Sequence, residues 1–90
     1  MADVLPAPGV ARMQPRLLVV EDDAHIRTFC QRLLRTTYIV ETAEHGGQAV
    51  ELLQKQPYDL ALVDLEMPVM NGIALLEHIR QRHAETDVVV

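Results

Sequence analysis

Two stretches of the sequence decide its fold: LLVVEDD at residues 17–23 and LALVD at residues 60–64. In each stretch, a short aliphatic run ends abruptly in acidic residues. Aliphatic runs of this length, rich in Val and Leu, are typical of strands that are buried on both faces of a parallel sheet. Because ligands bind at the carboxyl ends of the strands in an open α/β sheet, the acidic residues are predicted to lie at a binding site.

Three carboxylates are predicted to share this site: Glu21 and Asp22 after the first run, and Asp64 after the second. Like charges at such short range repel each other, so the pocket needs a cation or bound protons. A hard divalent ion, most simply Mg²⁺, is the natural ligand of an all-carboxylate site. Acidic residues ahead of a helix also favour its dipole, and Asp23 is interpreted as a helix cap or a solvated residue.

The 90-residue chain is long enough for one small domain. Residues 1–15 contain three prolines and no apolar period, and they are predicted to be a disordered leader. Residues 16–90 are predicted to be the domain. The leader lacks the apolar stretch of a signal peptide, and no segment approaches the length of a membrane span.

The charge and the cysteine content narrow the classes of function. Thirteen acidic and eight basic residues give a formal net charge of -5, which argues against direct nucleic acid binding by this segment. Cys30 is the single cysteine and cannot form an internal disulfide. We therefore expect a reducing, cytoplasmic setting.

The apolar pattern alternates between strands and helices along the chain. Strands are predicted over 17–20, 38–42 and 60–63, with the start of a fourth at 88–90. Helices are predicted over 24–35 and 48–54, and a third is expected to begin near Gly72, with Asn71 as its N-cap. This order predicts a parallel sheet with right-handed crossovers, and the partly alternating second strand suits a sheet edge.

Each predicted helix carries one apolar face that should pack on the sheet. These faces are Ile26, Phe29, Cys30, Leu33 and Leu34 in the first helix, Ala49, Val50, Leu52 and Leu53 in the second, and Ile73, Leu75, Leu76 and Ile79 in the third. The opposite face of the first helix carries Arg27, Arg32 and Arg35, which we interpret as solvated. His25, His45, His78 and His83 lack ligand spacing and are interpreted as surface residues.

Two motifs resemble the receiver domain of bacterial two-component response regulators. They are VVEDD at residues 19–23 and LVDLEMPVMNG at residues 62–72. The second is specific, because a strand ending in Asp is followed by Met-Pro and then by Asn-Gly. The resemblance covers Arg16 to the C-terminus. It implies a doubly wound α/β fold of flavodoxin type, with strand order 2-1-3-4-5.

The resemblance also implies a function and a role for each acidic residue. Asp64 would accept a phosphoryl group from a histidine kinase or a phosphotransfer protein. Asp22 and Asp64 would bind Mg²⁺ directly, Glu66 would bind it through its backbone carbonyl, and Glu21 would act through water. Such a module is no enzyme beyond its own phosphorylation and dephosphorylation, and the output it controls is not present in these 90 residues.

A complete receiver domain has five strands and five helices, whereas this sequence stops at the start of the fourth strand. The Ser or Thr after strand four and the Lys after strand five, which bind phosphoryl oxygens in the family, have no counterpart here; Thr86 and Lys55 do not replace them. The chain is therefore interpreted as a C-terminally truncated receiver, either a fragment or a shortened product. We expect its unpaired fourth strand to favour self-association.

Two other functions remain open from the sequence. One is a Mg²⁺-dependent phosphohydrolase with Asp64 as nucleophile, although phosphatases of the haloacid-dehalogenase type place a second Asp two residues later, where this chain has Glu66. The other is an interaction module that works without phosphorylation. Helix 24–35 is also where kinases dock in the family, so its arginines could form a partner surface.

Overall fold

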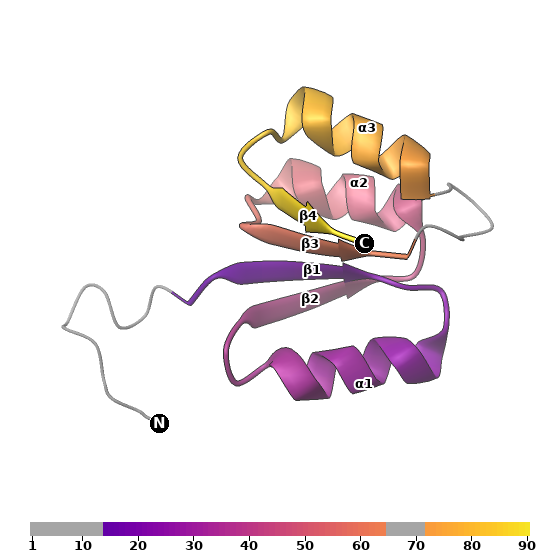
Figure 1. Cartoon of the computed structure of the whole chain (residues 1–90), viewed down its shortest axis with the longest axis vertical. Coiled ribbons are helices and arrows are strands. Elements are labelled where there is room, and N and C mark those ends of the chain that lie inside the picture. The colour runs from indigo at the N-terminus through magenta and orange to yellow at the C-terminus, as the bar shows by residue number, and fades with distance from the viewer. Residues whose placement is uncertain (1–13, 65–71) are drawn as a thin grey trace, which may run out of the picture.

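The computed structural model describes residues 14–64 and 72–90. It shows a parallel four-stranded sheet in the order β2-β1-β3-β4, with helices on both faces (Figure 1). The elements, in chain order, are β1 (Arg16–Val20), α1 (Ala24–Leu34), β2 (Ile39–Ala43), α2 (Gly46–Lys55), β3 (Leu60–Val63), α3 (Gly72–Arg82) and β4 (Asp87–Val89). The predicted fold class and strand order are confirmed, and β2 is an edge strand as expected.

The register places the carboxyl ends of the inner strands at one level. Val20, the last residue of β1, pairs with Ala43 on β2 and with Val63 on β3. Backbone hydrogen bonds continue one residue beyond the strands, from the Glu21 amide to the Ala43 carbonyl and from the Asp64 amide to the Val20 carbonyl, each 3.0 Å long. The residues that follow β1 and β3 are therefore side by side.

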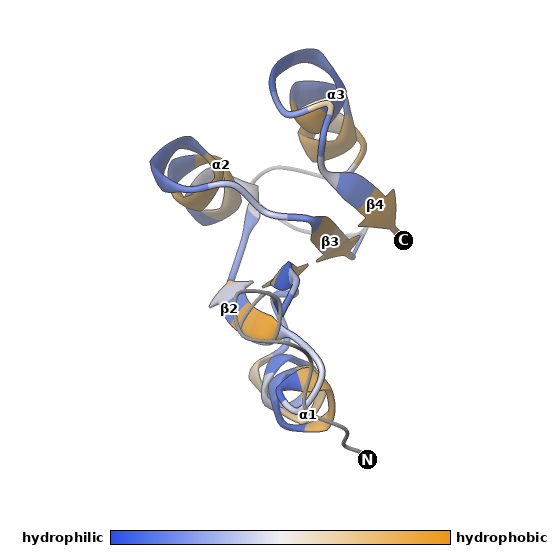
Figure 2. Cartoon of the chain, turned by 90° about the vertical axis from the view of Figure 1, so that its left-hand side faces the viewer, coloured by the Kyte–Doolittle hydropathy of each residue, from blue (hydrophilic) through white to orange (hydrophobic). Residues whose placement is uncertain are grey.

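The core lies on one face of the sheet, under α2 and α3. Figure 2 shows these two helices together on one side, with α1 alone on the other. Leu18 and Val20 of β1 and Ala61 and Val63 of β3 point into this core. The helices and the loop before β3 contribute the buried residues Ala49, Leu53, Tyr58, Leu75 and Ile79. None of the helices within residues 14–64 and 72–90 has the length and apolar character needed to cross a bilayer.

The apolar face of α1 is largely exposed, and the prediction that it would be buried is wrong for three residues. Phe29 is 64% exposed, Leu33 62% and Ile26 48%. The reason is that α1 packs mainly on β1 and β2, and no second helix among the described residues lies beside it (Figure 2). Val89 of β4 and Val90, which follows it, are also exposed.

The helix boundaries differ slightly from those predicted. Helix α2 begins at Gly46, two residues early, because His45 acts as its N-cap and its Nδ1 accepts a hydrogen bond from the Gln48 amide at 3.2 Å. Helix α3 buries Gly72, Leu75 and Ile79, a spacing of three and then four residues. Ile73, expected to face inward, is 61% exposed because it lies off this stripe.

A polar cluster closes the core near the amino ends of the strands. The Tyr58 hydroxyl donates to Glu41 Oε1, and Gln56 Nε2 donates to the Tyr58 hydroxyl at 3.2 Å. Thr86 Oγ1 donates to the Tyr58 carbonyl at 2.6 Å, which ties β4 to the loop before β3. Burial, followed by the nearby Glu41 carboxylate, raises the pKa of Tyr58 to about 12, so the phenol stays neutral and able to donate.

Replacing Tyr58 with Phe keeps the buried ring and removes only the hydroxyl that donates to Glu41. We expect the free energy of unfolding in urea to fall by about 1–2 kcal/mol, the cost of losing a hydrogen bond to a partly solvated carboxylate. Tyr38→Phe is the matched control, because no hydrogen bond to its hydroxyl is described; it should change stability little. Equal effects of the two substitutions would show that the Tyr58–Glu41 bond does not stabilise the fold.

The exposed apolar surface on α1 and the short edge strand β4 predict that the isolated chain is marginally stable and self-associates. Size-exclusion chromatography with light scattering should show oligomers, and replacing both Phe29 and Leu33 with Ser should reduce them. Ile73→Ser, an exposed apolar residue on α3, is the control. A monodisperse parent with a steep, cooperative urea transition would contradict this expectation.

Candidate metal centre

Three carboxylates meet where β1 and β3 end. One carboxylate oxygen from each of Glu21, Asp22 and Asp64 lies within 4.8 Å of the other two. Glu21 and Asp64 are partly buried, whereas Asp22 is exposed. The backbone hydrogen bonds that extend the ladder past Val20 hold Glu21 and Asp64 side by side, so the sheet itself brings these acids together as the sequence predicted.

The electrostatics of the cluster disfavour three free negative charges. Burial raises the pKa of Glu21 above its ordinary value, and the charge of Asp64 and the contact with Asp22 raise it further. A hydrogen bond from the Asp23 amide to Glu21 Oε2, 3.1 Å long, partly offsets this rise in pKa. An all-oxygen donor set of this kind, open on the side of Asp22, fits a hard divalent cation.

Asp23 is separate from the cluster, because its side chain caps α1. Its Oδ1 accepts hydrogen bonds from the amides of Ile26 and His25, at 3.1 and 2.8 Å. These bonds to the charged form lower the pKa of Asp23. The interpretation of Asp23 as a helix cap is confirmed.

Arg27 contributes to the site, although the sequence suggested a solvated residue. Its Nη1 donates to the backbone carbonyl of Glu21 at 2.9 Å and lies 3.4 Å from that of Asp22. Its Nη2 lies 3.9 Å from the carboxylate of Glu44, in the loop between β2 and α2. Arg27 thus holds the loop that carries two of the three carboxylates. Its place on the first turn of a helix that follows acidic residues is the sequence signal that could have suggested this role.

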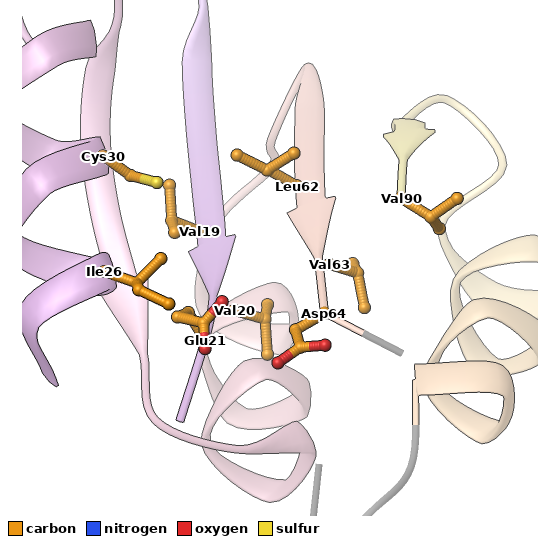
Figure 3. A pocket seen from close by; sticks show the side chains of 9 residues that line it. All are labelled: Val19, Val20, Glu21, Ile26, Cys30, Leu62, Val63, Asp64 and Val90. Atoms are coloured by element: carbon orange, nitrogen blue, oxygen red, sulfur yellow. The ribbon is translucent and has the colours of Figure 1, made fainter. Parts of the chain in front are cut away.

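An open hollow lies beside the carboxylates, on the α1 side of the sheet (Figure 3). Ile26 and Cys30 of α1 approach Val19 of β1 at one side, and the carboxylates of Glu21 and Asp64 lie close together at the end of the strands (Figure 3). Cys30 is half-buried rather than fully in the core. The hollow gives a ligand direct access to Asp64.

Two predicted features of the site fall in the segment 65–71, outside the described residues. They are the backbone carbonyl of Glu66 as a metal ligand and Asn71 as the N-cap of α3. Both remain predictions.

The family of the chain follows from comparison with known proteins. The sequence model of the response regulator receiver domain matches residues 17–90, which contain the sheet except for its first residue, Arg16, and all three carboxylates. The chain therefore belongs to the receiver domain family of response regulators.

Curated relatives and solved structures agree with this assignment. The chain is 35% identical to the chemotaxis protein CheY of Bacillus subtilis (strain 168) over 80 residues, which cover 87% of this chain and 67% of CheY. It is 43% identical over 70 residues to the sensor histidine kinase TmoS of Ectopseudomonas mendocina, covering 78% of this chain but 7% of TmoS. The response regulator TrrA of Thermotoga maritima, solved in complex with Mg²⁺-BeF, matches 84% of this chain and 67% of its own with a TM-score of 0.78 and 31% identity. The chain thus spans about two thirds of the length of CheY and of TrrA and a small part of TmoS.

Mg²⁺ should stabilise the chain, because a cation that binds only the folded state relieves the repulsion among the carboxylates. At a Mg²⁺ concentration one hundred times Kd, the gain in unfolding free energy is expected to be about 2.7 kcal/mol. Asp22→Asn should weaken Mg²⁺ binding strongly in a calorimetric titration.

Asp23→Asn is the matched control for that titration. It should keep the Mg²⁺ response, since Asn is also a good N-cap and the Asp23 side chain already bonds to α1. Equal losses of Mg²⁺ affinity in the two variants would place the metal elsewhere.

Proposed function

We propose that this chain is a phosphoacceptor module of two-component signal transduction, in which Asp64 receives a phosphoryl group from a histidine kinase or a phosphotransfer protein. The observation that carries the proposal is the position of Asp64. It follows a buried strand, its carboxylate lies within 4.8 Å of Glu21 and Asp22, and it borders an open hollow. Membership in the receiver family supports the same function.

The chemistry asked of Asp64 is nucleophilic attack. An oxygen of its carboxylate forms a bond to phosphorus while the bond between phosphorus and the donor imidazole nitrogen breaks, which leaves an aspartyl phosphate and a neutral donor histidine once that nitrogen is protonated. A carboxylate oxygen attacks through its own lone pair, so this step needs no general base. The sheet fixes the nucleophile through the hydrogen bond from the Asp64 amide to the Val20 carbonyl.

The other carboxylates are proposed to hold Mg²⁺ beside the nucleophile. Asp22 and Asp64 would bind it directly, Glu21 through water, and Glu66 through its backbone carbonyl. When bound, the ion would stabilise the negative charge that spreads over the phosphoryl oxygens in the transition state. Arg27 and the Asp23 cap would keep the loop after β1 in the geometry that presents Asp22.

The partners follow from the same chemistry. A histidine kinase or phosphotransfer protein is the proposed donor to this chain, for which a cytoplasmic location is proposed. The sensor kinase TmoS and the transcriptional regulator NtrC of Escherichia coli (strain K12) both contain a segment similar to this chain. The output would be carried by another domain or protein, and the net charge of -5 does not favour direct nucleic acid binding by this segment. The proposed function of this chain involves no membrane partner.

Family membership favours the phosphoacceptor over the phosphohydrolase. A hydrolase with Asp64 as nucleophile would turn over an ordinary phosphate ester continuously, whereas a phosphoacceptor is modified once and then loses the group slowly. We expect no steady turnover of p-nitrophenyl phosphate with Mg²⁺ present. Sustained turnover that Asp64→Asn abolishes would favour the enzyme.

The assignment of Asp64 is tested by mass spectrometry after incubation with acetyl phosphate and Mg²⁺. The parent chain should gain one phosphoryl group, mapped to the peptide that contains Asp64 and removed by hydroxylamine, as expected for an acyl phosphate. Asp64→Asn should not be labelled, whereas Asp87→Asn, which changes an exposed aspartate at the start of β4, should be labelled normally. Labelling of Asp64→Asn to the parent level would refute the assignment.

A further inference from the structure

Two of the four histidines come together at the end of α3. His78 lies on α3 and His83 directly follows its last residue, Arg82. The amide of His83 donates to the Ile79 carbonyl at 2.7 Å, which extends the helical turn and brings the two imidazoles together. Their ring centroids are 5.4 Å apart and the rings are tilted by 45°. The pair precedes β4, so it lies toward the amino ends of the strands. The carboxylate cluster lies at their carboxyl ends (Figure 1).

The Nε2 atoms of both rings are buried and have no hydrogen-bond partner among the described residues. Buried polar atoms are nearly always hydrogen-bonded, so two unpartnered nitrogens on neighbouring rings call for an explanation. Both residues are only half-buried overall. The pair therefore lies near the surface of the molecule, although the two Nε2 atoms themselves are covered.

The separation of the rings suits one metal ion between them. A Zn²⁺ ion binds imidazole nitrogen at about 2.0–2.1 Å in tetrahedral geometry, which places the centroids of two rings on the same ion about 5 Å apart. The observed separation of 5.4 Å between the ring centroids is close to this value.

We propose that His78 and His83 form a second metal site, in which the two Nε2 atoms bind one borderline divalent ion such as Zn²⁺ and water completes the coordination. Imidazole nitrogen suits Zn²⁺, Ni²⁺ and Cu²⁺, whereas Mg²⁺ requires oxygen ligands. The site is thus distinct in position and in metal class from the carboxylate cluster, and it does not depend on the proposed phosphoacceptor function.

The surroundings of the pair both favour and oppose metal binding. Burial lowers the pKa of His78, and the nearby His83 and Arg82 lower it further, which favours the neutral ring that can offer a lone pair. The positive charge of Arg82 also opposes a bound cation. Binding must therefore come from the two nitrogen–metal bonds, and loss of either histidine should remove most of it.

The test is calorimetric titration of the 90-residue chain with Zn²⁺ at pH 7.5, in excess Mg²⁺ to occupy the carboxylate cluster. One Zn²⁺ should bind per chain. Removing a residue that only hydrogen-bonds to a metal ligand often weakens metal binding by about 10- to 100-fold. Removing a ligand itself should cost at least as much affinity, so His78→Gln and His83→Gln should each weaken Zn²⁺ binding at least about tenfold. His25→Gln, an exposed histidine on α1, is the control and should bind as the parent does.

A spectroscopic measurement on the unmodified chain guards against variants that fold poorly. The electron paramagnetic resonance spectrum with one equivalent of Cu²⁺ should show coupling to two imidazole nitrogens, and circular dichroism should show that the variants remain folded. The proposal is overturned if either glutamine variant binds Zn²⁺ like the parent, or if the Cu²⁺ spectrum lacks two-nitrogen coupling.

Discussion

The repulsion among three carboxylates at the ends of β1 and β3 is the constraint on which the rest of the structure depends. Glu21, Asp22 and Asp64 would separate if they were carried on flexible loops. They stay together because β1 and β3 pair with each other and carry buried aliphatic residues, and because the ladder of backbone hydrogen bonds continues through Glu21 and Asp64. Burial of aliphatic residues in the two strands thus stabilises an arrangement of charges that would otherwise be unfavourable, and the same arrangement favours a cation.

The two faces of the sheet are unequally covered. On one face, α2 and α3 bury a contiguous aliphatic core that includes the side chains next to the site, Val20 and Val63. On the other face, α1 lies alone, and three of its apolar residues remain exposed, as does Val89 of β4. The carboxylates therefore rest on a rigid support from one side and border an open hollow on the other, which suits a site that must admit a phosphoryl donor.

The sequence predicted those features that depend on local pattern. Aliphatic runs that end in acids located β1, β3 and the carboxylate cluster, and the alternation of strands and helices predicted the parallel sheet. Asp23 was recognisable as a cap because it precedes an amphipathic segment. The strand order that the receiver resemblance implies agrees with the observed order β2-β1-β3-β4.

Features that depend on distant neighbours could not be predicted. Whether Phe29 is buried is decided by what lies beside α1, and the helical period alone carries no such information. The contact between His78 and His83 depends on the turn after α3, since residues five apart do not share a helical face. The role of Arg27 depends on the path of the chain after β1, which brings the Glu21 carbonyl within reach of its guanidinium.

The central claim is that the carboxyl ends of β1 and β3 form one metal-assisted phosphoryl site. Nuclear magnetic resonance of the ¹⁵N-labelled chain, with Mg²⁺ and then with beryllofluoride as a mimic of the phosphoryl group, tests it most directly. The account predicts that Mg²⁺ shifts the amides of Asp22 and Asp64 most, and that beryllofluoride adds a further shift at Asp64 only when Mg²⁺ is present. Shifts centred on another part of the chain, or a beryllofluoride response that is independent of Mg²⁺, would contradict it.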